Sequence, residues 1–310
     1  DLQESPPAWS RRLYPARADR PHLPVGRPRR PAHVALELRA VGLYRPLSGH
    51  EMMRTRGVQC RPWVWSGQKG PDMKNHRVVV SRHGGTGVLK VVEEDLPEPG
   101  AGEARVKVSA AGVSAYDLMH RRSGRLPGTP KVPFTLGLDV VGSVDKTGPG
   151  VSAVEVGDRV AAGPLEDFGG YTEFICIPAG DLVPVPDGVD AAEAVCVVVD
   201  YLTADVMLHE GAGVKRGERV LIQGAAGGVG TALIELGRLD DLEMYGTASR
   251  DNHEFVSALG ATPIDYQNED FVERVRELTG DGVDVAFDPI GGARQLWRSY
   301  QALRKGGRLV

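Results

Sequence analysis

Residues 219–232 form a short segment whose composition suits phosphate binding. An apolar run at 220–222 is typical of a buried parallel strand, a turn of Gly and Ala follows, and apolar residues then recur at helical spacing. Ala225, Gly227 and Gly230 occupy the three small-residue positions of the G-x-G-x-x-G dinucleotide fingerprint, in which glycine allows close approach of a pyrophosphate and close packing of the helix. A glycine-rich turn without a ligand has a similar composition. The segment predicts a phosphate site made by the following residues: Ala225, Ala226, Gly227, Gly228, Val229 and Gly230.

The residues that follow the second expected strand bear on the choice of nicotinamide. Enzymes that use NAD place an Asp or Glu there to bind the ribose hydroxyls. Here Ser249 and Arg250 follow the strand, and a hydroxyl and a guanidinium suit a 2′-phosphate. Asp251 comes next, where an acidic residue is expected at the start of a helix. The sequence therefore favours NADPH over NADH.

The elements that must position these residues alternate regularly. Strands are expected at 220–222, 244–248, 262–266, 283–287 and from 307 onward, and helices at 251–260, 271–280 and 293–304, in addition to the helix that follows the turn. Strands and helices that alternate with short connections predict a doubly wound parallel sheet, the Rossmann arrangement.

Further motifs recur in a fixed order on both sides of the fingerprint. They lie at 111–117, 133–142, 156–160, 169–173, 217–230, 259–266 and 288–292. Together they resemble the zinc-independent quinone oxidoreductase (zeta-crystallin-like) branch of the medium-chain dehydrogenase/reductases. The sequences at 246–249 and 288–292 are similar to those of its vesicle amine transport protein-like subgroup. The resemblance covers residues 74–310.

The resemblance implies an α/β protein with two domains. A GroES-like, β-rich catalytic domain is expected at 73–197 and a Rossmann nucleotide-binding domain at 198–310. Members of the family complete the nucleotide-binding sheet with further strands and return to the catalytic domain. We therefore expect this chain to be truncated at its C-terminus, and its parent to form a homodimer.

The resemblance also assigns roles to single residues. The family's catalytic loop holds a polar residue and a Tyr near the nicotinamide, and Ser114 and Tyr116 match them, although Ser114 stands where Asn is usual. Tyr116 is the candidate donor to a substrate carbonyl, and simple packing at a domain edge is the alternative. Thr203 matches the Thr that contacts the cofactor phosphate or ribose. Tyr266 matches a Tyr near the adenosine end, with core packing as its alternative.

The family's zinc-containing relatives carry ligands that this chain lacks. Zinc needs three or four N, S or O ligands in a tight cage. Ser114 stands where those relatives have Cys, residues 137–139 read Gly-Leu-Asp instead of Gly-His-Glu, and a cluster of four Cys is missing. We therefore expect no zinc. Asp117 is expected to order its loop or cap the next helix, Asp139 to be structural, and His120 and His209 to lie on the surface.

Composition agrees with a soluble enzyme. Hydrophobic residues make up 41% and charged residues 25% of the chain, and no apolar run reaches the length of a membrane span. Cys60, Cys176 and Cys196 show neither disulfide-like nor metal-like spacing, which favours a reducing, cytoplasmic location. Cys176 lies in an apolar strand pattern and is expected to be buried and inert.

Residues 1–72 differ from the rest of the chain. They hold 13 Lys and Arg against 6 Asp and Glu, a net charge of +7, together with ten Pro. Such a segment could bind nucleic acid or an anionic membrane, could be a transit peptide, or could be translated sequence upstream of a true start at Met73. We favour the last, because the resemblance begins directly after Met73. We expect disorder here and no nucleic-acid partner.

The activity expected of the parent protein is hydride transfer from NADPH to a quinone or an α,β-unsaturated carbonyl. Neither acceptor needs a metal, because its enolate charge is delocalised and hydrogen bonds can stabilise it. Two alternatives stay open: reduction of an enoyl thioester, and nucleotide binding without catalysis.

Overall fold

A computed structural model of the chain describes residues 73–163 and 168–310. The expectations for residues 1–72 lie outside the described residues. Within the described residues, no helix is long and apolar enough to cross a membrane.

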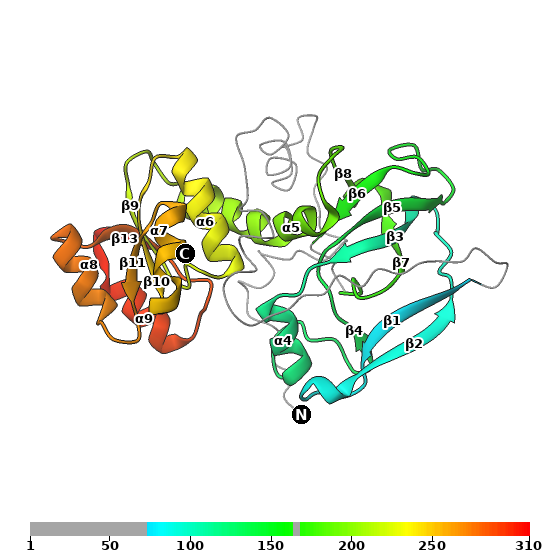
Figure 1. Cartoon of the computed structure of the whole chain (residues 1–310), viewed down its shortest axis with the longest axis horizontal. Coiled ribbons are helices and arrows are strands. Elements are labelled where there is room, and N and C mark those ends of the chain that lie inside the picture. The colour runs from blue at the N-terminus through cyan, green and yellow to red at the C-terminus, as the bar shows by residue number, and fades with distance from the viewer. Residues whose placement is uncertain (1–72, 164–167) are drawn as a thin grey trace, which may run out of the picture. The chain divides into compact units, whose positions relative to one another are not determined.

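The C-terminal part of the structure is built on a parallel sheet of five strands (Figure 1). The strand order is β11-β10-β9-β12-β13, so the fingerprint strand β9 lies in the centre. A central position buries both faces of a strand, which explains why Val220, Leu221 and Ile222 are all fully buried. The strands are β9 (Arg219–Ile222), β10 (Glu243–Ala248), β11 (Thr262–Asp265), β12 (Val283–Phe287) and β13 (Leu303–Leu309).

Helices cover both faces of this sheet, as the two hydrophobic clusters around it show. Alternate residues of a strand point to opposite faces. Val220 and Ile222 join a cluster with Leu233 of α6, whereas Leu221 joins a cluster with Val275 of α8. The helices are α6 (Gly228–Leu239), η4 (Arg250–Asn252), α7 (His253–Leu259), α8 (Phe271–Thr279) and α9 (Ala293–Gln301). The prediction of an α/β doubly wound sheet is confirmed.

The boundary between the last helix and the last strand was predicted wrongly. The expected helix at 293–304 ends at Gln301, and the strand expected from 307 begins at Leu303. The carbonyl of Ala302 accepts a hydrogen bond from the Val283 backbone, and the Arg304 side chain donates to Asp284 of β12. These contacts hold residues 303–306 at the sheet edge, where helical periodicity in the sequence gave no indication of a strand.

The N-terminal described part is β-rich and antiparallel. One sheet has the order β7-β3-β5-β6-β8 and a smaller one the order β2-β1-β4. The first contains β3 (Glu103–Ala111), β5 (Val140–Thr147), β6 (Arg159–Ala162), β7 (Phe174–Pro178) and β8 (Val183–Pro184). The second contains β1 (Lys74–Val80), β2 (Leu89–Asp95) and β4 (Phe134–Thr135). Three short helices, η1 (Thr86–Val88), α4 (Ala115–Arg122) and η2 (Ala179–Asp181), lie between these strands in the sequence.

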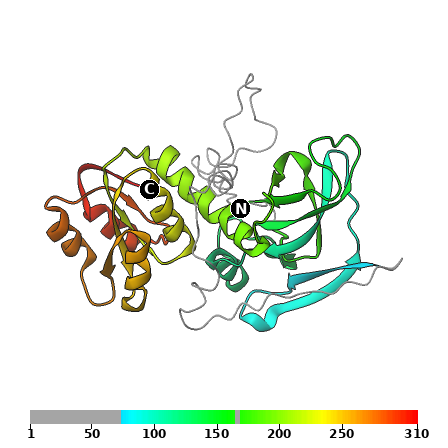
Figure 2. The same cartoon turned by 45° about the horizontal axis from the view of Figure 1, so that its top comes forward.

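A single helix, α5 (Ala191–Asp205), contains the position expected to divide the two domains at 197/198. Asp190 caps its N-terminus, and η3 (Val206–Ala212) continues it with π-helical geometry. Figure 2 shows the two as one long green helix. Val195 and Val198 join a cluster with Val141 of β5, whereas Val197 and Tyr201 join the cluster that contains α6. The helix therefore packs with both the antiparallel and the parallel parts, and it positions its polar residues beside elements of each.

Candidate active site

The fingerprint turn joins the end of β9 to the start of α6. Gly224 has a φ of +64°, which favours glycine, and Gly227 is the N-cap of α6. Gly227 and Gly228 are exposed, whereas Ala225 and Gly230 are buried. A Cβ on Gly230 would lie only 2.8 Å from the Ala225 Cα, so the helix could not pack this closely with a larger residue. The N-terminus of α6 thus offers unpaired N–H groups and a positive dipole end at an accessible turn.

Buried polar side chains that we did not predict from the sequence hold this turn through a series of hydrogen bonds. The Gly224 backbone N–H donates to Thr247 Oγ1 at 3.0 Å, and the Thr247 hydroxyl donates to Gln223 Oε1 at 2.8 Å. Gln223 Nε2 then donates to Ser299 Oγ at 3.1 Å, and the Ser299 hydroxyl donates to Asp288 Oδ2 at 2.8 Å. We call these four side chains (Gln223, Thr247, Ser299 and Asp288) the relay; all four are buried.

The relay also reaches the loop at 288–292. Asp288 Oδ1 accepts from the backbone N–H groups of Ile290 and Gly291 at 3.2 and 3.0 Å. The Ile290 side chain in turn lies where it would meet a Cβ on Gly224 at 3.1 Å. A signal for the relay was present in the sequence, because Gln223 and Asp288 each directly follow a buried apolar strand and Thr247 lies near the end of another.

The residues expected to choose between NADPH and NADH lie at the carboxyl end of the neighbouring strands. Ala248 of β10 pairs with Asp265 of β11, so Ser249 and Tyr266 leave the sheet side by side. Ser249 is the N-cap of η4, and its hydroxyl accepts from Asn252 Nδ2 at 3.1 Å. Arg250 is exposed and close enough to Asp265 to help hold the pKa of that carboxyl below its usual value, after the hydrogen bond from Asn268. Tyr266 is 53% exposed, so core packing is not its role.

The loop expected to carry catalysis is ordered by a capping box. Ser114 is the N-cap of α4, and its hydroxyl donates to Asp117 Oδ2 at 2.8 Å. The Asp117 backbone N–H donates back to Ser114 Oγ at 3.3 Å. Asp117 is 1% exposed and also accepts from the Gly137 backbone at 3.0 Å, so it orders the loop and caps the helix as expected. The Ser114 hydroxyl is thus engaged within its own loop.

Tyr116 lies on an aromatic cluster at the exposed side of α4. Its ring centroid is 4.2 Å from that of His120 and 6.0 Å from that of Phe168, and it stacks on Phe168. Tyr116 is 42% exposed, and Val113 and Met119 beside it in the sequence are exposed too. The loop therefore presents a phenol hydroxyl next to an apolar surface.

The placement of His120 on the surface was wrong. His120 is fully buried, and its Nδ1 lies 2.7 Å from Thr129 Oγ1. The ring packs between Tyr116 and Phe168, and burial lowers its pKa, because the charged form loses hydration. Helical periodicity could not predict this, because Phe168 and Thr129, which help to bury it, come from other segments of the chain. The side chain of His209, in contrast, is 46% exposed and pairs with Asp205.

Thr203 lies on α5 and is half-buried. Its hydroxyl donates to the Val199 carbonyl at 2.8 Å, one turn earlier in the same helix. The hydroxyl hydrogen of Thr203 is thus used within the helix, whereas its oxygen can still accept a hydrogen bond. The structure places Thr203 on the helix that the resemblance predicted for it, and its contact with the cofactor stays a prediction.

The sequence can now be placed among known proteins. Residues 100–187 match the model of the alcohol dehydrogenase GroES-like domain, and residues 228–310 match that of the zinc-binding dehydrogenases. The quinone oxidoreductase of Rattus norvegicus is 32% identical over 235 residues, which are 74% of this chain and 70% of that protein. The chain belongs to the quinone oxidoreductase branch of the medium-chain dehydrogenase/reductase superfamily.

Two further relatives refine this placement. The synaptic vesicle membrane protein VAT-1 homolog of Rattus norvegicus is 35% identical over 216 residues, 69% of this chain and 52% of that protein. The chain thus spans about half the length of the VAT-1 homolog. A mycobacterial protein solved in complex with NADPH is 35% identical with a TM-score of 0.70, and the match covers 76% of this chain and 73% of that one. The expected quinone oxidoreductase and VAT-1-like branch is confirmed.

The described part of the chain shows no group of three or more His, Cys, Asp or Glu side chains that could hold a metal ion. Ser114 and Asp139 lie where zinc-containing members were expected to carry ligands, and both have other partners. Cys176 was expected to be buried but is half-buried in β7, where burial raises the pKa of its thiol; its inert role stays a prediction. Cys60 lies outside the described residues.

Two buried or partly buried carboxyl groups, Asp139 and Asp200, have strongly raised pKa values. Asp139 is 7% exposed and accepts from the Gly112 backbone at 3.1 Å, which agrees with the expected structural role. Burial raises the pKa of Asp139 to about 7, and the nearby Asp200 and Asp117 add to the shift. Burial likewise raises the pKa of Asp200 on α5 to about 6. The sequence analysis did not single out Asp200, because an acid inside an apolar helical run gives no sign of what packs against it.

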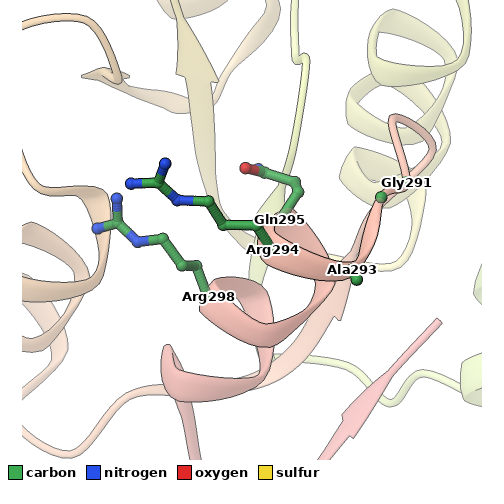
Figure 3. A pocket seen from close by; sticks show the side chains of 6 residues that line it. Gly291, Ala293, Arg294, Gln295 and Arg298 are labelled. Atoms are coloured by element: carbon green, nitrogen blue, oxygen red, sulfur yellow. The ribbon is translucent and has the colours of Figure 1, made fainter.

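A hollow at the start of α9 is lined by Arg294, Gln295 and Arg298, with residues 291–293 at its rim (Figure 3). Arg298 donates to Asp270 and lies over the Phe271 ring. Arg294 is exposed. We assign no ligand to this hollow.

Proposed function

We propose that the protein is an NADPH-dependent reductase that works without zinc and reduces a quinone or an α,β-unsaturated carbonyl. The observation that carries this proposal is the exposed Gly227–Gly228 turn at the N-terminus of α6, with Ser249 and Arg250 after the adjacent strand. The mycobacterial relative solved with NADPH supports the choice of cofactor. The rat quinone oxidoreductase supports the class of acceptor.

The residues of the chain have distinct tasks in this proposal. The backbone N–H groups at the start of α6 would hold the pyrophosphate, and Ser249 and Arg250 would hold the 2′-phosphate. Bound NADPH supplies the hydride. The Tyr116 hydroxyl would donate a hydrogen bond to the acceptor carbonyl and so stabilise the oxyanion that hydride addition creates. The exposed apolar side chains of Val113 and Met119 suit a flat, apolar acceptor such as a quinone.

A second candidate is nucleotide binding without catalysis. It is favoured by one observation: the hydroxyl of Ser114, the polar residue assigned to the nicotinamide side, donates to Asp117 within its own loop. Reduction of enoyl thioesters needs the same hydride donor and the same carbonyl polarisation, and it remains a third outcome of the test.

The test combines cofactor binding and turnover. NADPH binding is measured by fluorescence, and NADPH oxidation is followed with a quinone, an enone and a crotonyl thioester in parallel. Turnover of the quinone or the enone supports the proposal. Turnover of the thioester alone supports an enoyl reductase, and binding without any turnover supports a nucleotide-binding protein.

Gly227→Val tests the turn itself. Gly227 has an extended backbone, with φ −84° and ψ 172°, that valine can adopt, and a Cβ there would lie 3.2 Å from the Gly224 carbonyl oxygen. The branched side chain would occupy the approach of the pyrophosphate. Gly85→Val is the matched control, because Gly85 is also extended and a Cβ there meets nothing within 4 Å. We expect Gly227→Val to abolish binding of NADPH and NADH and Gly85→Val to leave both intact. Normal cofactor binding by a folded Gly227→Val protein would disprove the site.

A further inference from the structure

A carboxyl group lies against the first residue of α6. The Asp200 side chain, on α5, occupies the space where a Cβ on Gly228 would be, with its Cγ only 2.6 Å from that position. Gly228 is the first helical residue after the N-cap Gly227. Asp200 therefore packs directly on the part of the turn to which the proposed function assigns the pyrophosphate.

Two opposing electrostatic effects act on an anion at the start of α6. The positive end of the α6 dipole attracts any negative charge, including the Asp200 carboxylate and a phosphate. When both are present, they repel each other, because two like charges lie near one helix end in a partly buried setting. A protonated Asp200 removes this repulsion, and its O–H becomes a hydrogen-bond donor.

The surroundings of Asp200 offer no compensating cation among the described residues. The titratable group coupled to it is Asp139, the acid next to β5, whose pKa the charged form of Asp200 helps to raise. The raised pKa of Asp200 itself is due to burial. Other charged side chains on elements packed against α5 have partners elsewhere: Arg105 with Asp145, Arg159 with the carbonyls of Pro186 and Val189, Glu235 with the Tyr201 hydroxyl, and His209 with Asp205 and Asp240. Lys107 of β3 is exposed. The neighbourhood thus favours the neutral acid.

We propose that Asp200 takes up a proton when the pyrophosphate of the dinucleotide binds at Gly227–Gly230, so that cofactor affinity falls as the pH rises. This inference rests on the proposed function, since it needs a dinucleotide at this turn. It adds that Asp200 makes the affinity for the cofactor depend on pH.

The direction and range of the effect follow from linkage. Burial already raises the pKa of Asp200 to about 6 in the unbound protein, and a phosphate nearby raises it further. Below about pH 6 the acid is neutral before binding, and affinity is at its maximum. Above the pKa of the complex the carboxylate is charged in both states, and affinity reaches a lower plateau. Each unit by which binding raises the pKa lowers affinity about tenfold between these limits.

The experiment measures the dissociation constant of the full chain for NADH and NADPH from pH 5.5 to 8.5. NADH is included because the 2′-phosphate of NADPH itself titrates near pH 6. For the wild type we expect the affinity for both cofactors to fall about tenfold or more as the pH rises. Asp200→Asn should remove this part of the pH dependence and bind at pH 8.5 at least as tightly as the wild type does at pH 5.5.

Calorimetry provides a second readout. At pH 7, NADH binding to the wild type should take up a proton, seen as a heat that changes with the ionisation enthalpy of the buffer. Asp200→Asn should lose that uptake. Asp205→Asn is the matched control: Asp205 is a partly buried acid on the same helix with a raised pKa, but it pairs with His209. It should keep the wild-type profile.

The outcomes separate this inference from the proposed function. If the wild type binds NADH with the same affinity from pH 5.5 to 8.5, or if Asp200→Asn keeps the wild-type profile, the role of Asp200 is disproved and the cofactor site stands. If neither NADH nor NADPH binds at any pH, both the proposed function and this inference are wrong. Melting temperatures of the variants show that each is folded at each pH.

Discussion

Arg250 is the residue on which the choice of cofactor depends. A charge-assisted hydrogen bond to a phosphate contributes about 1.5–3 kcal/mol, so Arg250→Ala should weaken NADPH binding about ten- to a hundredfold. NADH lacks the 2′-phosphate, and its affinity should change little. The measurement is a pair of binding titrations, with Arg294→Ala as the control because Arg294 is another exposed arginine of the same domain. Small and equal effects on both cofactors would contradict the assignment.

Ser299 is the residue whose loss should expose the cost of the relay. Ser299→Ala leaves Gln223 Nε2 and Asp288 Oδ2 buried without their partner. An unsatisfied buried polar group costs about 1–3 kcal/mol, so the free energy of unfolding should drop by about that amount. Urea denaturation checks this, and Ser257→Ala, at an exposed serine, should change it by less than about 0.5 kcal/mol. A stability loss no larger than that of the control would show that water replaces the serine.

Helix α4 connects the catalytic loop to the stability of the fold. Ser114→Ala removes the capping box and should destabilise the protein by about 0.5–2 kcal/mol, whereas Ser114→Thr keeps the hydroxyl and should restore most of it. If Ser114 only caps the helix, the alanine variant will lose stability while KM and kcat stay nearly unchanged at a temperature where it is folded. A large fall in kcat that threonine restores would instead give the hydroxyl a role in the reaction.

Some features of the helices and strands could be predicted from the sequence, and others could not. The order of strands and helices from β9 to β12 followed from periodicity, because β9 and β12 are largely apolar runs and α8 has one apolar face. The end of α9 did not, because the contacts of Ala302 and Arg304 with β12 come from tertiary structure. The fingerprint was visible because its small residues lie close together in the sequence, and Gly230 is required by the close approach of α6 to Ala225. His120 and Asp200 were misjudged or missed because their burial depends on distant segments.

Residues 1–72 are rich in Arg and Pro, and this composition predicts that they contribute few packed contacts. A protein that begins at Met73 should therefore keep its melting temperature and its NADPH affinity relative to the 310-residue chain. Differential scanning fluorimetry and a binding titration test this. A fall of many degrees in the melting temperature would make residues 1–72 part of the fold.

The whole protein is also expected to work without zinc, because residues 114 and 137–139 carry none of the ligands that zinc-containing relatives use. Treatment with EDTA should leave NADPH oxidation unchanged, and elemental analysis should find no stoichiometric zinc. Activity that is lost on chelation and restored by added zinc would reverse this prediction.

The relay has a consequence for how this protein can change over evolutionary time. Gln223 and Ser299 are 76 positions apart, yet the Gln223 amide donates to the Ser299 hydroxyl just beyond the central strand β9, and Ile290 fills the space that Gly224 leaves open. A replacement at one of these positions removes a partner from another, so tolerated substitutions should occur as compensating pairs. A double-mutant cycle with Gln223→Leu and Ser299→Ala should show strong non-additivity, since the second change relieves a defect that the first creates. The phosphate turn and the 288–292 loop would then be inherited as one unit.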